Sequence, residues 1–206
     1  MALEATHIKF ALDLRDKYKP SDLGQYICGT VYPDSRYLTG IDRHLTHEES
    51  LVDKRNADDF SKGWAVHFLC DKIDNMLIGE NFPELLSNKN KEEWWVNLSA
   101  IKNVQDICLV KNFDVRGYLK YLDNLYNPNG EDLGKIRGYN QLIQNFYRNK
   151  EIDAEDCRKM WLGLGVESRL VDLVHIATCE LLNREGVNIV MENLYKEMLA
   201  RASEDF

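Results

Sequence analysis

Apolar side chains recur every three to four residues over most of this chain, a spacing that places them on one face of an α-helix. The chain shows no convincing strand alternation outside residues 26–32, no heptad array and no internal repeat. The pattern predicts an all-α bundle of about eight helices, forming a single domain over residues 1–206. A short helix is expected at 41–48, a turn with one helical turn within 81–86, and longer helices at 3–18, 58–78, 90–110, 114–126, 132–149, 153–161, 167–183 and 187–202.

The helical pattern is interrupted between residues 20 and 40. Prolines and glycines are spread through this stretch, with β-branched and aromatic residues between them: Pro20, Gly24, Gly29, Pro33 and Gly40. We expect one long structured loop here, and Asp34 lies in it. Because loops held between helices commonly carry functional groups, this loop is a candidate for a functional role.

The charge balance limits the classes of partner. The 206 residues include 34 acidic and 26 basic side chains, with a formal net charge of −8. No nucleic-acid partner is expected, because such a chain offers no broad cationic face to a phosphate backbone or an anionic membrane. A small phosphorylated substrate is still compatible, since one cation-loaded pocket can override the overall field.

Cysteine usage and hydropathy indicate a cytoplasmic protein. The five cysteines form no CxxC pair, and several lie in apolar helical stretches, as reduced core thiols do. The first residues include charged side chains and do not form a secretory signal. No apolar stretch approaches the length of a transmembrane segment.

Three polar side chains share one face of the otherwise apolar segment 58–78. His67, Asp71 and Asp74 occupy positions i, i+4 and i+7. Burying a carboxylate without a partner costs roughly several kcal/mol, and a divalent cation is one partner that meets this demand. Further candidate ligands lie upstream: His7, Asp34, His44 and His47. Imidazole and carboxylate ligands are typical of zinc, iron or manganese, and a metal site with an open position supports hydrolysis.

Each candidate also has an ordinary structural interpretation. A lone histidine on an apolar face is more often a hydrogen-bonded core residue, and a His–Asp pair one turn apart can simply stabilise a helix. Asp74 could be a solvated surface residue, and an aspartate in a turn often caps its own backbone. Only one of His44 and His47 needs to point inward. His175 shares a face with Asp172 and Cys179, so it could complete the site or form a second one, although its apolar neighbours favour a structural histidine.

Four short motifs resemble, in the same order, those of the zinc-dependent phospholipase C family. They are Thr6-His7-Ile8, Gly29-Thr30-Val31-Tyr32-Pro33-Asp34, Arg43-His44-Leu45-Thr46-His47 and His67-Phe68-Leu69-Cys70-Asp71. The resemblance covers the first 71 residues and implies an all-α fold, shared with single-strand-specific nucleases, that holds up to three zinc ions. It implies that His7, Asp34, His47, His67 and Asp71 are metal ligands. It also implies that Asp34 bridges two metals or acts as general base on the attacking water.

The chain departs from this family pattern downstream. It has no histidine between His67 and His175, and Glu180 follows His175 by five residues where the family has an HxxxE pair. A mononuclear or dinuclear site built from Asp34, His47, His67 and Asp71 is therefore the more economical expectation. The HD-type phosphohydrolases, a second all-α family of metal enzymes, rank lower because their adjacent His-Asp dipeptide is absent from this sequence.

The predicted function is a metal-dependent hydrolase that acts on a phosphoric ester, either a soluble phosphoester or a lipid. Asp34 would assist deprotonation of the attacking water, and Arg36 and Arg43 would orient the phosphate. Lys54 and Arg55 are nearby too, although ordinary surface charge is the better interpretation for them. The alternative is a non-catalytic helical interaction module with a structural or vestigial metal site. In that case Trp94-Trp95 and the Tyr118/Tyr121 region would form the interaction surface, although burial in the core is the more ordinary role for them.

Overall fold

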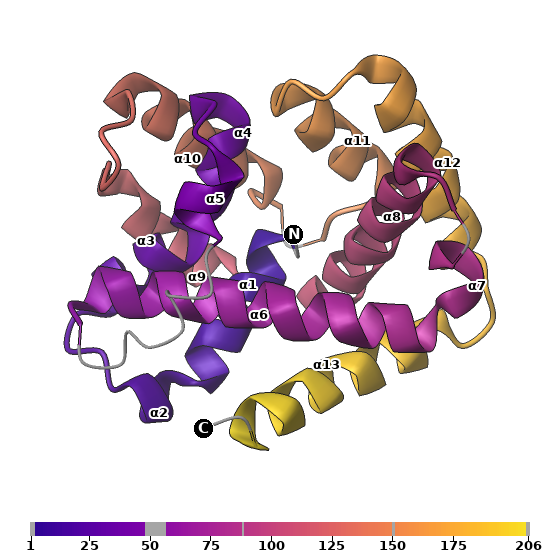
Figure 1. The fold of residues 1–206 in the computed structure, drawn as a ribbon, viewed down its shortest axis with the longest axis horizontal. Helices are drawn as coiled ribbons and strands as arrows, with labels where there is room; N and C mark the ends of the chain where they lie inside the picture. Colours follow the sequence, from indigo (N-terminus) through magenta and orange to yellow (C-terminus); the bar gives the residue numbers. More distant parts are fainter. Residues whose placement is uncertain (1–2, 48–56, 88, 150, 205–206) are drawn as a thin grey trace.

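The computed structural model describes residues 3–47, 57–87, 89–149 and 151–204, and these residues are helical with no β-strand (Figure 1). The predicted all-α class is therefore confirmed. The helices, with η for 3₁₀ helices, are α1 (Glu4–Asp13), α2 (Arg15–Tyr18), α3 (Leu23–Val31), η1 (Tyr32–Ser35), α4 (Arg36–Thr39), α5 (Arg43–Thr46), α6 (Asp59–Asn81), α7 (Pro83–Leu86), α8 (Lys91–Val110), α9 (Arg116–Leu119), η3 (Lys120–Asp123), α10 (Leu133–Phe146), α11 (Ala154–Gly163), α12 (Ser168–Leu182) and α13 (Val187–Glu204).

Helix α6 is the longest element and runs across the molecule (Figure 1). Its N-terminus is capped by Asp58, whose carboxylate accepts a hydrogen bond from the backbone N–H of Ser61. Helices α1, α3 and α13 all pack against α6, so most of its circumference is buried. Polar side chains in the middle of α6 are therefore enclosed by protein, and the candidate ligands His67 and Asp71 are among them.

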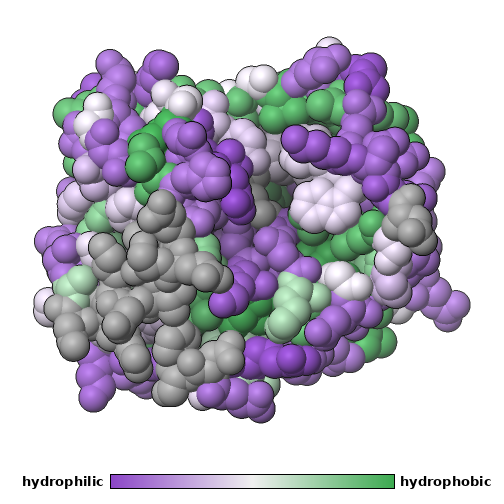
Figure 2. All heavy atoms as spheres, in the orientation of Figure 1, coloured by the Kyte–Doolittle hydropathy of each residue, from purple (hydrophilic) through white to green (hydrophobic). Residues whose placement is uncertain are grey.

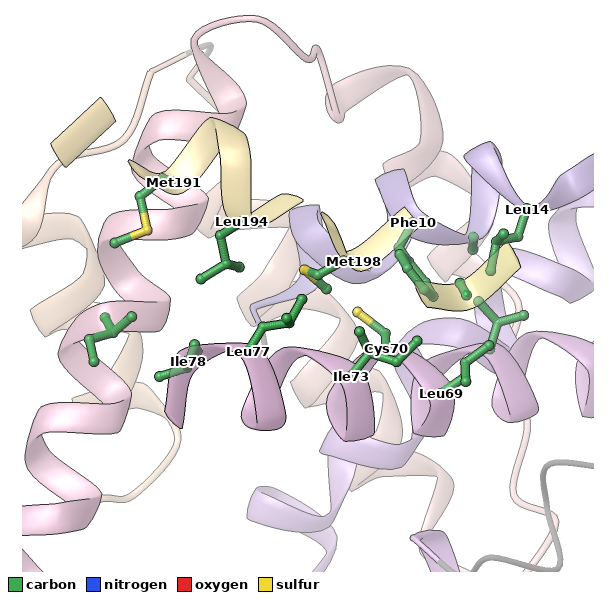
Figure 3. Packing of buried hydrophobic residues seen from close by; sticks show 14 of the residues in the cluster. Phe10, Leu14, Leu69, Cys70, Ile73, Leu77, Ile78, Met191, Leu194 and Met198 are labelled. Atoms are coloured by element: carbon green, nitrogen blue, oxygen red, sulfur yellow. The ribbon is translucent and has the colours of Figure 1, made fainter. Parts of the chain in front are cut away.

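Apolar packing holds α1 and α13 against α6. Figure 3 shows side chains from the three helices meeting in one cluster: Phe10 and Leu14 from α1, Leu69, Cys70, Ile73, Leu77 and Ile78 from α6, and Met191, Leu194 and Met198 from α13. This cluster fixes the position of α1 along α6. Since α1 carries His7, the apolar contact also decides where that imidazole lies.

Helices α3 and α6 approach each other more closely than side chains normally allow. A Cβ atom added to Gly29 of α3 would lie 1.9 Å from the carbonyl oxygen of Phe60, and one added to Gly63 of α6 would lie 1.9 Å from that of Tyr26. Only glycine fits such backbone contact. The two glycines therefore set the distance between the helix carrying Thr30 and the helix carrying His67.

Helices α11, α12 and α13 of the second half pack against α8, which also lies against α1. Helix α8 begins with a capping box formed by Asn90 and Glu93. Helix α11 begins with another, in which Asp153 and Asp156 exchange hydrogen bonds with each other's backbone N–H. The helix expected at 153–161 corresponds to α11, with Asp153 as its N-cap.

Two sequence predictions about the fold are corrected. The helical segments outnumber the eight expected, because several are single turns of four residues, too short to produce a periodic pattern. Residues 20–40 are mostly helical, as α3, η1 and α4, and do not form a long loop. Asp22 caps α3 by accepting hydrogen bonds from the N–H groups of Gly24 and Gln25, and Gly29 serves helix packing there.

Smaller corrections concern helix ends. The helix expected at 3–18 is divided at Leu14 into α1 and α2, and the one expected at 114–126 is the short α9 followed by η3. The helix expected at 41–48 is one turn, Arg43–Thr46, and residue 48 lies outside the described residues. Among the helices described, none is long and apolar enough to cross a membrane.

Candidate metal centre

The structure brings together five side chains that are far apart along the chain. They come from four elements and are all buried: His7 on α1, Asp34 in η1, His47 at the end of α5, and His67 and Asp71 on α6. These are the five residues that the family resemblance marks as ligands. Their convergence depends on α1, α3–η1 and α5 all packing near the middle of α6.

The reactive atoms of the cluster lie within a few ångströms of one another. His67 Nε2 is 3.3 Å from His47 Nε2 and 3.8 Å from Asp34 Oδ2. His47 Nε2 is 3.5 Å from Asp71 Oδ2, and His7 Nε2 is 3.7 Å from Asp71 Oδ1 and 3.9 Å from Asp34 Oδ2. Ligands around a tetrahedral zinc ion are roughly 3.4 Å apart, given bonds of about 2.1 Å. The observed spacings are close to this value.

Two overlapping ligand sets result. His7, Asp34 and His67 form one, and His47, His67 and Asp71 form the other; in each set the candidate donor atoms all lie within 4.8 Å of one another. His67 belongs to both. The two sets offer ligands for one ion or for two neighbouring ions.

An outer hydrogen bond sets the tautomer of one imidazole. His67 Nδ1 lies 2.8 Å from the backbone carbonyl of Thr30, which can only accept, so Nδ1 carries the proton and Nε2 keeps its lone pair. His47 Nδ1 lies 2.7 Å from Thr46 Oγ1, a hydroxyl that also lies 3.2 Å from the Arg43 carbonyl oxygen. The Nε2 lone pair of His67 faces Nε2 of His47 at 3.3 Å.

His7 and Asp34 carry polar atoms that the surrounding protein leaves unsatisfied. The His7 ring stacks on that of His67 with centroids 3.8 Å apart. Both ring nitrogens of His7 and both carboxylate oxygens of Asp34 are buried and make no hydrogen bond within the described part of the chain. Leaving such groups without a partner costs about 1–3 kcal/mol each. A bound cation would supply a partner for one ring nitrogen of His7 and for the Asp34 carboxylate.

The protonation states suit metal ligands. Burial lowers the pKa of His67 to about 4, and burial likewise lowers the pKa values of His7 and His47. Burial and the neighbouring Asp71 raise the pKa of Asp34 to about 6. Burial opposes ionisation of Asp71, but nearby positive charge, including Lys102, and the hydrogen bond with His47 hold its pKa well below the usual range. Neutral imidazoles beside an ionised carboxylate are the forms that coordinate metals.

Asp74, an additional candidate ligand, belongs to neither ligand set. Its Oδ2 lies 3.5 Å from Lys102 Nζ, and its Oδ1 accepts a hydrogen bond of 3.0 Å from Gln105 Nε2. Lys102, on α8, is only 1% exposed; its ammonium also donates to Asn75 Oδ1 at 2.7 Å and lies 3.7 Å from Asp71 Oδ1. The sequence-based interpretation missed Lys102. The available signal was a lysine between the apolar residues Ile101 and Val104.

The other predicted residues have different positions. His44 is exposed on α5, with its backbone N–H bonded to Asp42, while His47 points into the cluster. His175, on α12, is bonded through Nδ1 to the carbonyl of Ala154 at 3.1 Å and belongs to neither ligand set. Arg36 Nε lies 4.0 Å from Asp34 Oδ1. Lys54 and Arg55 lie outside the described residues.

A cavity of about 340 Å³ opens beside the cluster. Asp71 and Lys102 line its inner end, Arg36 and Arg43 belong to α4 and α5, and Trp94 and Trp95 to α8. Figure 2 shows the corresponding face hollowed near its centre, between the α4–α5 side and the α8 side. Of the five candidate ligands, Asp71 alone is among the residues that line this cavity, so a molecule bound there reaches the cluster at Asp71.

No protein-family model, curated protein or solved structure matches this chain. The resemblance to the zinc-dependent phospholipase C family therefore rests on the four sequence motifs, and function has to be argued from the geometry of the site.

Proposed function

We propose that the cluster binds one or two divalent metal ions, zinc in the first place and manganese or iron as alternatives, and that the protein hydrolyses phosphoric esters. The observation that carries the proposal is the convergence of three imidazoles and two carboxylates in a buried site, with Nε2 of His47 and Nε2 of His67 only 3.3 Å apart. The lowered pKa values of these two imidazoles favour the neutral forms that coordinate metals.

The donor set fits these metals. Three imidazole nitrogens and two carboxylates match the ligands that zinc, iron and manganese take in proteins. The hydrogen bonds of His67 with Thr30 and of His47 with Thr46 are the outer contacts that usually orient such ligands. The unsatisfied atoms of His7 and Asp34 support the same assignment.

A metal bound in this cluster would supply an acidified water and stabilisation of negative charge on a phosphoryl oxygen. Asp34 is placed to accept the proton of the attacking water, because its carboxylate is buried in the cluster and has a pKa of about 6, near the range that suits a general base at neutral pH. The Arg36 guanidinium, 4.0 Å from this carboxylate, is placed to hold the phosphate of a substrate in the cavity.

The first test is the metal content of the protein purified without chelator, together with hydrolysis of p-nitrophenyl phosphoesters. We expect stoichiometric zinc, manganese or iron in the wild type and in His44→Gln, the control for an exposed histidine close to the site. His67→Gln should lose the metal and the activity. Asp34→Asn, which is nearly isosteric, should lower kcat by about 100-fold or more.

Circular dichroism separates loss of metal from loss of folding. Wild-type protein without stoichiometric metal, and without affinity for added zinc, would contradict the whole proposal. Stoichiometric metal with no hydrolysis of any phosphoester would leave a structural metal site in a non-catalytic helical module. Equal metal loss in His44→Gln and His67→Gln would place the ion elsewhere.

A further inference from the structure

The cavity beside the cluster combines positive charge with an aromatic wall. Of the residues described that line it, Arg36, Arg43 and Lys102 are basic and Asp71 alone is acidic. This excess of positive charge occurs in a chain whose formal net charge is −8. A local excess against the overall charge is what an anion-binding pocket requires.

Two of the basic groups are held in place, unlike ordinary surface charges. The Lys102 ammonium is buried and donates to Asn75 Oδ1. The Arg36 guanidinium lies over the ring of Tyr37, with its Cζ 4.3 Å from the ring centroid. Its Nε is buried and makes no hydrogen bond within the described residues. This Nε lies 4.0 Å from Asp34 Oδ1, on the side of the cluster, while Arg36 also lines the cavity, where its planar fork matches a phosphate.

The aromatic wall is rigid and partly uncovered. Trp161 is buried and makes edge contacts with Trp95, at a centroid distance of 5.6 Å, and with Tyr37, at 6.1 Å. Trp94, beside Trp95 on α8, is 41% exposed. Large aromatic surfaces left open beside charged groups commonly mark a ligand site. A planar organic group would cover this wall while its phosphate reached the basic residues.

We propose that the substrates are phosphomonoesters with an aromatic or similarly planar organic group, an inference that rests on the proposed hydrolase function. Arg36 and Arg43 bind the terminal phosphate, the buried Lys102 adds positive charge at the cavity wall, and Trp94 and Trp95 bind the organic group. A phosphomonoester carries close to two negative charges at neutral pH, because its second pKa is about 6, whereas a phosphodiester carries one. Three basic groups together with a divalent cation favour the more highly charged species. One aromatic wall accommodates one planar group.

The test compares esters that share one organic group, using the full chain loaded with zinc. We expect p-nitrophenyl phosphate to be hydrolysed with a kcat/KM at least about tenfold above that for bis(p-nitrophenyl) phosphate. Arg43→Gln should lower the monoester value by about 10- to 100-fold and reduce the preference between the esters. The control, Lys111→Gln, removes a basic side chain of the surface outside this cavity and should change neither value. Trp94→Leu should raise KM for p-nitrophenyl phosphate more than KM for glycerol phosphate.

A binding measurement separates this inference from the hydrolase proposal. Phenyl phosphate should change the tryptophan fluorescence of the zinc-loaded protein at lower concentration than diphenyl phosphate, and Arg43→Gln should remove the difference. If this holds while no ester is hydrolysed, the hydrolase proposal fails and the phosphomonoester site stands. Equal or stronger binding of diphenyl phosphate, or faster hydrolysis of the diester, would overturn the inference. Preferred hydrolysis of a short-chain phosphatidylcholine would also overturn it and favour a lipid substrate.

Discussion

Replacing Gly63 by alanine is a direct test of how α6 is placed against the rest of the site. The new Cβ would lie 1.9 Å from the carbonyl oxygen of Tyr26 and 2.8 Å from the backbone nitrogen of Thr30. Both contacts are with backbone, so no side chain can rotate away. Helices α3 and α6 would have to separate by about 1 Å to reach the 3.0 Å that real Cβ contacts respect.

The cost follows from two opposing effects. Overpacking in a core costs about 1–3 kcal/mol, and the rigid contact here favours the upper end. Alanine regains about 1 kcal/mol over glycine in helix propensity, so we expect a net loss of about 2 kcal/mol in the free energy of unfolding. Because Thr30 holds the His67 imidazole through its carbonyl, the shift should also weaken zinc binding.

Gly79 provides the matched control in the same helix. A Cβ there would meet nothing within 4 Å, and the residue is exposed, so Gly79→Ala should be neutral or stabilising by up to about 1 kcal/mol. Urea unfolding followed by far-ultraviolet circular dichroism, and zinc titration of each folded variant, give both quantities. If Gly63→Ala were as stable as Gly79→Ala, the close contact of α3 with α6 would be wrong, and with it the placement of His67.

Two further predictions concern buried acids and helix capping. Burial, with the nearby Asp34 carboxylate, raises the pKa of Glu4 from 4.5 to about 8. Between these two pH values the folded protein keeps a proton on Glu4 that the unfolded protein releases, so the free energy of unfolding falls as the pH rises. Glu4→Gln should therefore gain stability over wild type by roughly 1 kcal/mol per pH unit between pH 5 and 8, measured by urea unfolding of metal-free protein; a constant difference would contradict the shift. Asp153→Ala should cost about 1 kcal/mol by loss of the α11 cap, whereas Asp172→Ala, which leaves every cap intact, should cost less; equal losses would contradict the capping role.

The parts of the fold that could be predicted are those that depend on the local sequence pattern. Helices α6 and α8 carry long periodic apolar patterns, and Asp153 with Asp156 marks the start of α11. Helix α3 could not be predicted, because its glycines resemble turn residues. Their role appears only when Gly29 meets the backbone of α6, a contact between segments more than thirty residues apart.

The candidate ligands show the same division between local pattern and long-range contact. The sequence indicated that Asp71 and Asp74 need partners if they are buried, and both are buried. The partner could not be inferred, because an isolated lysine in an amphipathic helix usually extends to solvent. In the structure Lys102 on α8 instead faces Asp74 on α6, with its Nζ 3.5 Å from Oδ2, and supplies the positive charge that a further metal would have supplied. A buried aspartate two helical turns after a candidate ligand, as Asp74 is after His67, therefore indicates either another metal ligand or a buried lysine partner. The position of the neighbouring helix decides between the two.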